Sequence, residues 1–434
     1  MEGRQAETVP VMPPPARAGM SRRRFLGAAT ATAGAICLGR ALPAESARAR
    51  FDHVVVVMME NRSFDHLLGW LPGADGRQAG LTFLDAAGAP HATHPLAPDF
   101  QGCANADPDH SYEGGRVEFN GGACDGWMRA GANDDYAVGY HDQGDLPFLG
   151  QAAPQWTVCA RYFAPIMAET YPNRIYLHAG QTDRIRNTRA VCRLPTIWDR
   201  LAAARVSGRY YFSDIPFLAL WGRRFAHIGR PVAGFYADCA RGTLPAVSVV
   251  DPKFMDAARG TSGDDHPHGD IRRGDAFMAR IYRAVTAGPA WPRTVLIFTF
   301  DEWGGFFDHV APPTAPVPPA TAAAGDQDGR LGFRVPCLIV SPFARRGHIA
   351  TNVYDHTSIL RMIESRWGLP ALTIRDRTAN DLGLELVAQP QTTAPRLSVA
   401  APPAPTACAP ATGPTSTETW TGLRALARLS GWRV

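Results

Sequence analysis

Short runs of apolar residues recur along the chain without alternating with polar residues. Residues 54–59 read VVVVMM, 247–250 read VSVV, 294–300 read TVLIFTF and 335–341 read VPCLIVS. Runs of this length that are rich in β-branched residues are typical of strands buried on both faces of a mainly parallel sheet. The four runs therefore predict strands of one central sheet.

Helical patterns lie between these runs. In residues 274–287 and 356–367 the apolar positions recur at intervals of three and four. Strands that alternate with helices predict an α/β fold in which helices cover a parallel sheet. The Gly/Asp-rich stretches 102–145 and 259–270 are expected to form long loops, and loops of that length in a compact domain are often functional.

The two ends of the chain differ from its middle. Residues 22–26 read RRRFL and precede an Ala/Thr/Gly-rich stretch with a small-x-small site, which indicates a twin-arginine export signal over residues 1–49. A basic linker before an ordinary helix is the alternative. Residues 388–434 begin as a Pro/Ala/Thr-rich, poorly packed linker and end in a short predicted helix. One domain of catalytic size is expected over residues 50–387.

Composition and charge exclude several classes of protein. The 434 residues are 45% apolar and 19% charged, which is typical of a globular protein, and outside the signal no run approaches the ~20 apolar residues of a membrane span. The signal carries seven arginines and three glutamates, so without it the formal net charge falls from +4 to zero. A nucleic-acid partner is therefore not expected, whereas a neutral enzyme can still act on lipid.

Seven cysteines follow the signal and are scattered, with no C-x-x-C pair. An exported protein can form disulfides, and Cys103 with Cys124 or Cys159 with Cys192 are possible pairs. The odd number leaves at least one thiol free.

Polar side chains follow two of the predicted strands. Glu60 and Asn61 come directly after the first run, and Asp301 and Glu302 come after the run that ends at Phe300. Because ligands bind at the carboxyl ends of strands in such sheets, these oxygen donors are expected at one edge, where a cation would keep the carboxylates ionised. Acidic residues at strand ends also cap helices or pair with arginine, but two such pairs favour a site.

A helix is predicted to begin within residues 169–177, ETYPNRIYL. Thr170 lies two residues before Pro172, which suits a first turn, and an apolar face begins at Ile175. A hydroxyl at a helix N-terminus sits where the dipole and free N–H groups favour an anion. An ordinary N-cap is the alternative.

Four histidines each follow an aspartate: His110, His266, His309 and His356. His266 and His309 lie beside Gly-rich turns near strand ends, where a neutral imidazole can bind a metal or a phosphate oxygen. A structural hydrogen-bonding role is the alternative, and it is the role that we expect for His356, which opens an amphipathic helix.

Four motifs together carry a family resemblance. In order they read ENRSFDHLLG, TYPNR, DEWGGFFDHVAPP and YDHTSILRMIESRWGLPALTIRD, and they resemble the bacterial phosphoesterase family of phospholipase C enzymes and a related acid phosphatase. The resemblance extends from about Phe51 to Leu384. It implies an alkaline-phosphatase-like three-layer sandwich, with phosphate esters hydrolysed by a Ser or Thr nucleophile beside a divalent metal.

The resemblance also implies roles for individual residues. The family's metal ligands match four oxygen donors: Glu60, Asn61, Asp301 and Glu302. Thr170 matches the nucleophile, and Asn61 also matches a phosphate contact. His110 and His266 match histidines that contact phosphate or the leaving group, with His268 as a competitor for the second position.

Substrate contacts are expected from Asn61, Arg174 and His309, although Arg62 and Arg174 are also suited to tying loops down. Oxygen ligands favour Ca²⁺, Mg²⁺ or Mn²⁺ as the divalent metal, and a histidine ligand would admit Zn²⁺ or Fe. In the mechanism that the resemblance implies, the Thr170 alkoxide attacks phosphorus, a phosphothreonine forms, and a histidine protonates the leaving oxygen.

The function predicted from the sequence is that of a periplasmic or secreted phospholipase C acting on phospholipids such as phosphatidylcholine, with an acid phosphatase as the alternative. The chain lacks a clustered Cys motif and a G-x-G-x-x-G after a strand, which weakens a redox enzyme, and lacks G-x-S-x-G, which weakens a serine esterase. A non-catalytic binding protein would be expected to have lost Thr170 or an acidic pair. Trp127, Trp303 and Phe306 could form a choline cage, but we expect them in the core.

Overall fold

The computed structural model describes residues 51–408 and 416–434 of the chain. The predicted export signal over residues 1–49 lies outside the described residues. The compact unit that the described residues belong to extends over Ser46–Val434. Among the helices of the described residues, none is both long enough and apolar enough to cross a bilayer.

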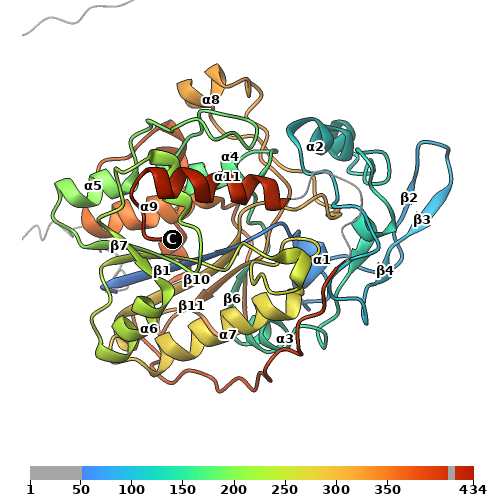
Figure 1. Cartoon of the computed structure of the whole chain (residues 1–434). Coiled ribbons are helices and arrows are strands. Elements are labelled where there is room, and N and C mark those ends of the chain that lie inside the picture. Colours follow the sequence, from blue (N-terminus) through green and yellow to red (C-terminus); the bar gives the residue numbers. More distant parts are fainter. Residues whose placement is uncertain (1–50, 409–415) are drawn as a thin grey trace, which may run out of the picture. The chain divides into compact units, whose positions relative to one another are not determined.

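An eight-stranded sheet lies at the centre of this unit, in the order β12-β6-β11-β10-β1-β9-β7-β8 (Figure 1). The strands are β1 His53–Met59, β6 Thr157–Cys159, β7 Gly208–Phe212, β8 Gly229–Pro231, β9 Val247–Asp251, β10 Thr294–Phe300, β11 Cys337–Val340 and β12 His348–Ala350. Every neighbouring pair is parallel except the two pairs made by β11. The predicted mainly parallel sheet is confirmed, and β11 departs from it because a fully buried apolar run does not encode strand direction.

Helices cover both faces of the sheet (Figure 1). One layer contains α4 Thr170–Ala179, α5 Ile197–Ala203, α9 His356–Trp367 and α11 Ser416–Leu429, and the other contains α3 Pro147–Ala152, α6 Val232–Arg241 and α7 Ile271–Ala287. The shorter elements are α1 Phe64–Leu68, α2 Tyr112–Phe119, α8 Pro319–Ala323, α10 Ile374–Thr378, and the strand pairs β2 Thr82–Leu84 with β3 Pro90–Ala92 and β4 His94–Pro95 with β5 Gly139–Tyr140. The predicted three-layer α/β sandwich is confirmed.

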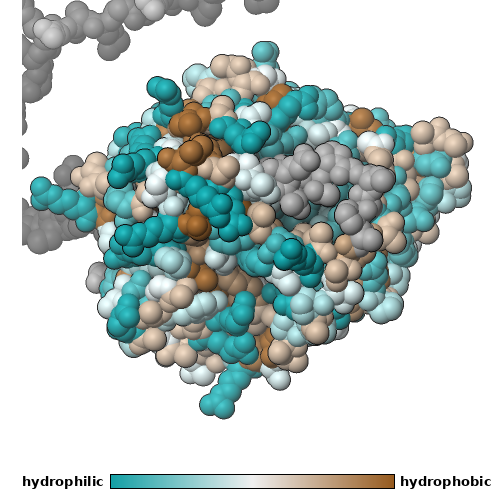
Figure 2. Space-filling view, viewed as in Figure 1, coloured by the Kyte–Doolittle hydropathy of each residue, from teal (hydrophilic) through white to brown (hydrophobic). Residues whose placement is uncertain are grey.

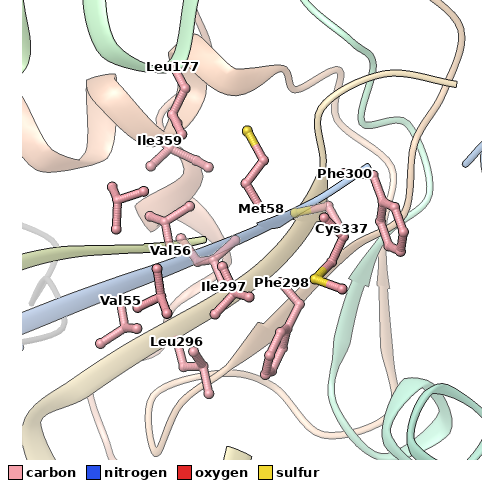
Figure 3. Packing of buried hydrophobic residues seen from close by; sticks show 14 of the residues in the cluster. Val55, Val56, Met58, Leu177, Leu296, Ile297, Phe298, Phe300, Cys337 and Ile359 are labelled. Carbon is pink, nitrogen blue, oxygen red and sulfur yellow. The ribbon is translucent and has the colours of Figure 1, made fainter. Parts of the chain in front are cut away.

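The apolar runs form the core between these layers. All six residues of 54–59 are fully buried in β1. Leu177 of α4 and Ile359 of α9 pack on one face of the sheet, while Leu296 and Phe298 of β10 point to the other (Figure 3). Burial on both faces explains why the runs do not alternate with polar residues.

The sequence predicted a long loop over residues 102–145, but part of this stretch is helical. It contains α2, whose N-cap Ser111 accepts a hydrogen bond from the backbone N–H of Gly114 at 2.9 Å. The glycines at 114 and 115 have low helix propensity, so the sequence does not predict a helix here. Both glycines are buried, and tertiary packing outweighs the free-energy cost of placing them in a helix.

The C-terminal segment is better packed than the sequence predicted. Residues 388–408 are extended, but they are fastened to the body, since Trp291 Nε1 donates to the Thr392 carbonyl at 2.6 Å and the Tyr282 hydroxyl donates to the Pro395 carbonyl at 2.7 Å. The predicted C-terminal helix is present as α11, and Leu423 within it is fully buried. The expectation of a loosely structured tail is therefore wrong for the described residues.

The disulfide also differs from the pairs suggested by sequence spacing. Cys103 is bonded to Cys408, 305 residues away, whereas Cys124, Cys159 and Cys192 are free thiols. A bridge of this sequence separation depends on the tertiary fold, so local spacing could not reveal it.

The surface carries no broad apolar area on the face seen in Figure 2, where hydrophobic residues are dispersed among hydrophilic ones. Among the described residues, the large hydrophobic side chains that are exposed lie on separate elements and loops: Leu84, Val117, Val191, Leu384 and Leu429. Single exposed residues of this kind are normal and indicate no docking face.

A buried carboxyl group on α9 leads to a prediction about stability. Burial of Glu364, together with the nearby Asp376 carboxylate, raises the pKa of Glu364 to about 9. Because the pKa of Glu364 is higher in the folded state, its protonated form contributes fully to the free energy of unfolding below the unfolded-state pKa. This contribution is lost as the pH rises through about 9. We expect Glu364→Gln, which is neutral at both pH values, to raise the melting temperature at pH 9 and change it little at pH 5. Calorimetry at the two pH values measures this; an equal shift at both would contradict it.

Candidate active site at the strand ends

The two predicted pairs of oxygen donors are brought together by the register of the sheet. Met59 of β1 pairs with Phe300 of β10, so the residues that follow the two strands leave the sheet at the same level. The Asn61 backbone N–H donates to Asp301 Oδ1 at 3.1 Å, and the Glu302 N–H donates to the same oxygen at 2.8 Å. The strand-end pairs therefore form one hydrogen-bonded cluster.

The backbone at this edge is tightly constrained. Asn61 has a φ of 57°, in the left-handed region that non-glycine residues rarely adopt. Gly304, in the turn after Glu302, has a φ of 66°, and a Cβ there would meet the Asn61 carbonyl oxygen at 2.2 Å. A glycine is required at 304 so that the two strand-end loops can touch.

Arg174 on α4 lies at the centre of a buried carboxylate cluster. Its Nε donates to Asp301 Oδ2 at 2.9 Å, its Nη1 donates to Asp251 Oδ1 at 3.1 Å, and its Nη2 lies 3.1 Å from Glu60 Oε1. Nη2 also donates to the Met58 and Met59 carbonyls at 3.3 and 3.2 Å. With its donors used in this way and its side chain buried, Arg174 is placed to orient the carboxylates rather than to contact substrate.

Thr170 is the first residue of α4, as predicted, and it lies one helical turn before Arg174 on the same face. Its side chain is almost buried, with 4% exposed. The loop before the helix is fixed by Asn173, whose Nδ2 donates to the Ala168 carbonyl at 2.6 Å while its Oδ1 accepts from the Ile166 N–H at 3.1 Å. The TYPNR motif thus holds a hydroxyl at a helix N-terminus beside the carboxylate cluster.

Two of the predicted histidines lie together beside this cluster, with ring centroids 6.0 Å apart. His110 Nδ1 donates to the Pro108 carbonyl at 2.7 Å, which turns Nε2 toward Asn61 Nδ2 at 3.2 Å and Glu302 Oε1 at 4.0 Å. Burial opposes a charge on His110, but Glu302 and other carboxylates outweigh it and raise the pKa to about 10. The structure therefore joins His110 directly to the predicted ligands.

His266 has a different environment. Its Nδ1 is within 3.1 Å of the Pro267 carbonyl and its Nε2 lies 3.7 Å from Asp107 Oδ2. Burial lowers the pKa of His266, which favours the neutral imidazole. The competitor His268 instead points its Nε2 toward the Asn105 carbonyl at 3.0 Å, which leaves His266 as the histidine next to His110.

The donor set fits a divalent cation. Four buried side-chain oxygens of the predicted ligands have no hydrogen-bond partner among the described residues: Glu60 Oε1, Glu60 Oε2, Asn61 Oδ1 and Glu302 Oε1. Burial raises the pKa of Glu60, and it raises the pKa of Glu302 to about 8. Carboxylates that are buried and not fully paired are costly, and a hard cation coordinated by oxygen would stabilise their ionised forms.

A second acidic group, Asp65, Asp308 and His309, also has its potential ligand atoms close together. Its oxygens are already used, because Arg334 pairs with Asp65 Oδ1 at 3.0 Å and with Asp308 Oδ1 at 2.9 Å. The His309 N–H donates to Asp65 Oδ2 at 2.9 Å, and the His309 ring contacts the same oxygen. This group is a satisfied salt-bridge network, because none of its carboxylate oxygens is among the buried atoms without a hydrogen-bond partner in the described residues, whereas oxygens of Glu60, Asn61 and Glu302 are.

His309 is therefore not brought into the cluster with the other predicted site residues. Its ring contacts Asp65 and, through Nε2, Asp75 at 3.2 Å. His356 has the structural role that we expected, because its Nε2 hydrogen-bonds the Asp301 carbonyl at 2.9 Å and so fixes the strand end. The aromatic residues considered for a cage, Trp127, Trp303 and Phe306, are fully buried, as expected for the core.

Two members of the site were missed by sequence reasoning. Asp251 is the last residue of β9, is buried, and accepts hydrogen bonds from Arg174 and the Tyr210 hydroxyl. The strand-end rule that selected Asp301 applies equally to Asp251, which directly follows the run 247–250. Asp264, whose carbonyl accepts from the Glu60 N–H at 2.7 Å, lies in a loop and had no comparable signal.

Comparisons with known proteins show the family to which the chain belongs. Residues 51–370 match the model of the phosphoesterase family, and the chain belongs to that family. Phospholipase C A of Mycobacterium tuberculosis is 30% identical over 88% of this chain and 88% of its own, and non-specific phospholipase C6 of Arabidopsis thaliana is 29% identical over 75% and 70%. A solved structure described as a protein in the alkaline phosphatase superfamily from Vibrio parahaemolyticus covers 77% of this chain and 70% of its own, with 9% identity and a TM-score of 0.40.

Proposed function

We propose that this chain is an exported, metal-dependent phospholipase C that hydrolyses phospholipids such as phosphatidylcholine through a phosphothreonine intermediate. The observation that carries the proposal is the meeting of the Glu60–Asn61 and Asp301–Glu302 strand ends with the helix that begins at Thr170. The names of the relatives favour a phosphodiester over a monoester. An acid phosphatase on the same site is the alternative.

In the proposed reaction the Thr170 oxygen attacks phosphorus while the alcohol leaves from the opposite side. The positive end of the α4 dipole lies at Thr170 and stabilises the negative charge that develops on the phosphoryl oxygens. Asn61 supports the same oxygens through its side-chain amide. The proton of the Thr170 hydroxyl passes to one of the two histidines, His110 or His266, while the leaving oxygen takes a proton from the other. Water then hydrolyses the Thr170 ester and releases the head group as its phosphomonoester, and the two histidines exchange these roles.

The carboxylate cluster has two tasks in this proposal. Glu60, Asn61, Asp301 and Glu302 would hold the divalent ion, which would supply a Lewis acid to the reaction. Arg174 balances the remaining charge on Asp301, Asp251 and Glu60 and so keeps these side chains in place when no ion is bound. Oxygen ligands favour Ca²⁺, Mg²⁺ or Mn²⁺, and a contribution from His110 would admit Zn²⁺ or Fe.

The disulfide between Cys103 and Cys408 supports export, because such bonds persist in oxidising compartments. We place the enzyme in the periplasm or outside the cell, delivered by the twin-arginine machinery that the sequence at residues 22–26 indicates.

Rates on p-nitrophenylphosphorylcholine and p-nitrophenyl phosphate test the function. We expect kcat/KM to be at least about tenfold higher for the diester, because the relatives are named as phospholipases C, which cleave a phosphodiester. Chelation should abolish the rate and added divalent ion should restore it. The same assay on periplasmic, extracellular and cytoplasmic fractions locates the enzyme. A preference for the monoester would support the acid phosphatase, and no turnover of either ester would overturn the proposed function.

A further inference from the structure

The C-terminal helix contributes an aromatic side chain next to the site. Trp420 of α11 is 1% exposed and stacks on Phe254, with ring centroids 3.9 Å apart and an interplanar angle of 9°. Its ring is also 5.8 Å from that of Tyr171, the residue after Thr170. Trp420 therefore touches both the start of α4 and the loop that follows β9.

Phe254 connects this helix to the carboxylate cluster. The Arg174 guanidinium carbon lies over the Phe254 ring at 4.8 Å from its centroid. Phe254 therefore contacts both the Trp420 ring and the Arg174 guanidinium. A flat cation held on an aromatic face is favourable and restricts the orientation of the guanidinium.

The orientation of Arg174 matters because its nitrogens serve different carboxylates. Nε is directed at Asp301 and Nη1 at Asp251, so a tilt of the guanidinium plane would disturb both contacts together. Asp301 in turn accepts the backbone N–H of Asn61. Movement of Arg174 would therefore be transmitted to two of the proposed metal ligands.

The segment that leads to α11 is fastened near the histidines. Cys408 is disulfide-bonded to Cys103, and its N–H donates to the Ala258 carbonyl at 2.8 Å. Gln101 Nε2 donates to the Thr406 carbonyl at 2.9 Å. These anchors lie in the loops that continue to Asp107 and His266, so the C-terminal segment is bound to the site region independently of Trp420.

We propose that the C-terminal segment is a built-in positioning element of the active site, in which Trp420 acts through Phe254 to hold Arg174 in the orientation that serves Asp301 and Asp251. Trp420 touches no substrate in this proposal; it fixes the groups that do the chemistry. The proposal rests on the proposed phosphoesterase function and adds to it a residue from a part of the chain outside the family match at 51–370.

Three variants of the full mature chain test the proposal. Trp420→Leu removes the stacking ring but keeps an apolar side chain, Trp420→Phe keeps an aromatic ring, and Leu423→Ala is a matched control that creates a cavity in the same helix at a fully buried position. We expect kcat of Trp420→Leu to fall about tenfold with KM nearly unchanged, because misplaced catalytic groups lower transition-state stabilisation. Trp420→Phe should recover most of kcat, and Leu423→Ala should lower the melting temperature but leave kcat unchanged.

A double-mutant cycle between Trp420→Leu and Phe254→Leu tests whether Trp420 acts on kcat through Phe254 or only stabilises the fold. If Trp420 acts through Phe254, the double variant should have a kcat close to that of the more affected single variant, since the second change removes a contact already lost. Rates are measured well below each melting temperature. A wild-type kcat in folded Trp420→Leu, or strictly additive losses, would overturn the inference. A wild-type enzyme without turnover would instead overturn the proposed function.

Discussion

Thr170→Ala is expected to lower kcat by at least about 10³-fold while leaving the fold intact, in line with the losses seen when a covalent nucleophile is removed from other hydrolases. The side chain is nearly buried at the first position of α4. Alanine keeps the Cβ and removes the proposed attacking oxygen. Alanine is also a good helix former, so the helix itself should persist.

Thr170→Ser is the matched control, because it keeps the hydroxyl and removes only a methyl group. We expect it to retain measurable turnover, and a rapid-quench experiment should trap a phosphorylated enzyme with wild type and Thr170→Ser but not with Thr170→Ala. Circular dichroism and melting curves establish that all three proteins are folded. Wild-type turnover by Thr170→Ala, or a phosphoenzyme that maps to another residue, would contradict the assignment.

The part of the site that could be predicted from sequence follows from a local rule. A fully apolar run that stops at Glu60 or at Asp301 indicates a buried strand with a polar end, and parallel strands end at the same edge of a sheet. In the structure Met59 pairs with Phe300, so the two polar pairs follow their strands at the same level of the sheet. No knowledge of the intervening 240 residues is needed for this step.

The remaining features depend on long-range packing. The Arg174 side chain was expected at the substrate, yet the fold surrounds it with Glu60, Asp251 and Asp301, and three carboxylates around one buried cation make it an internal counterion. The Pro-rich composition of 388–408 predicts an extended chain but not the backbone acceptors that Trp291 and Tyr282 use to bind it. Composition predicts the local conformation of a segment, whereas these contacts depend on the side chains that the fold places next to it.

We expect opposite effects on metal binding when one carboxylate is neutralised in each of the two acidic groups. Glu60→Gln is expected to reduce bound divalent metal from about one ion per chain to almost none, because it removes a charged ligand whose Oε2 has no hydrogen-bond partner among the described residues. Metal content after purification, measured by inductively coupled plasma mass spectrometry, checks this directly. The melting temperature of Glu60→Gln should match that of chelated wild type and should no longer respond to added ion, since only a ligand that binds the native state stabilises it.

Asp308→Asn is the matched control, because it also neutralises one buried carboxylate but in the group paired with Arg334. Breaking that pair leaves a buried guanidinium without one of its partners, so the variant should melt at a lower temperature and yet keep its metal. The two variants thus separate loss of stability from loss of the ion. If Asp308→Asn loses the metal and Glu60→Gln keeps it, the ion belongs to Asp65, Asp308 and His309, and the nucleophile would then have to be sought near those residues instead of at Thr170.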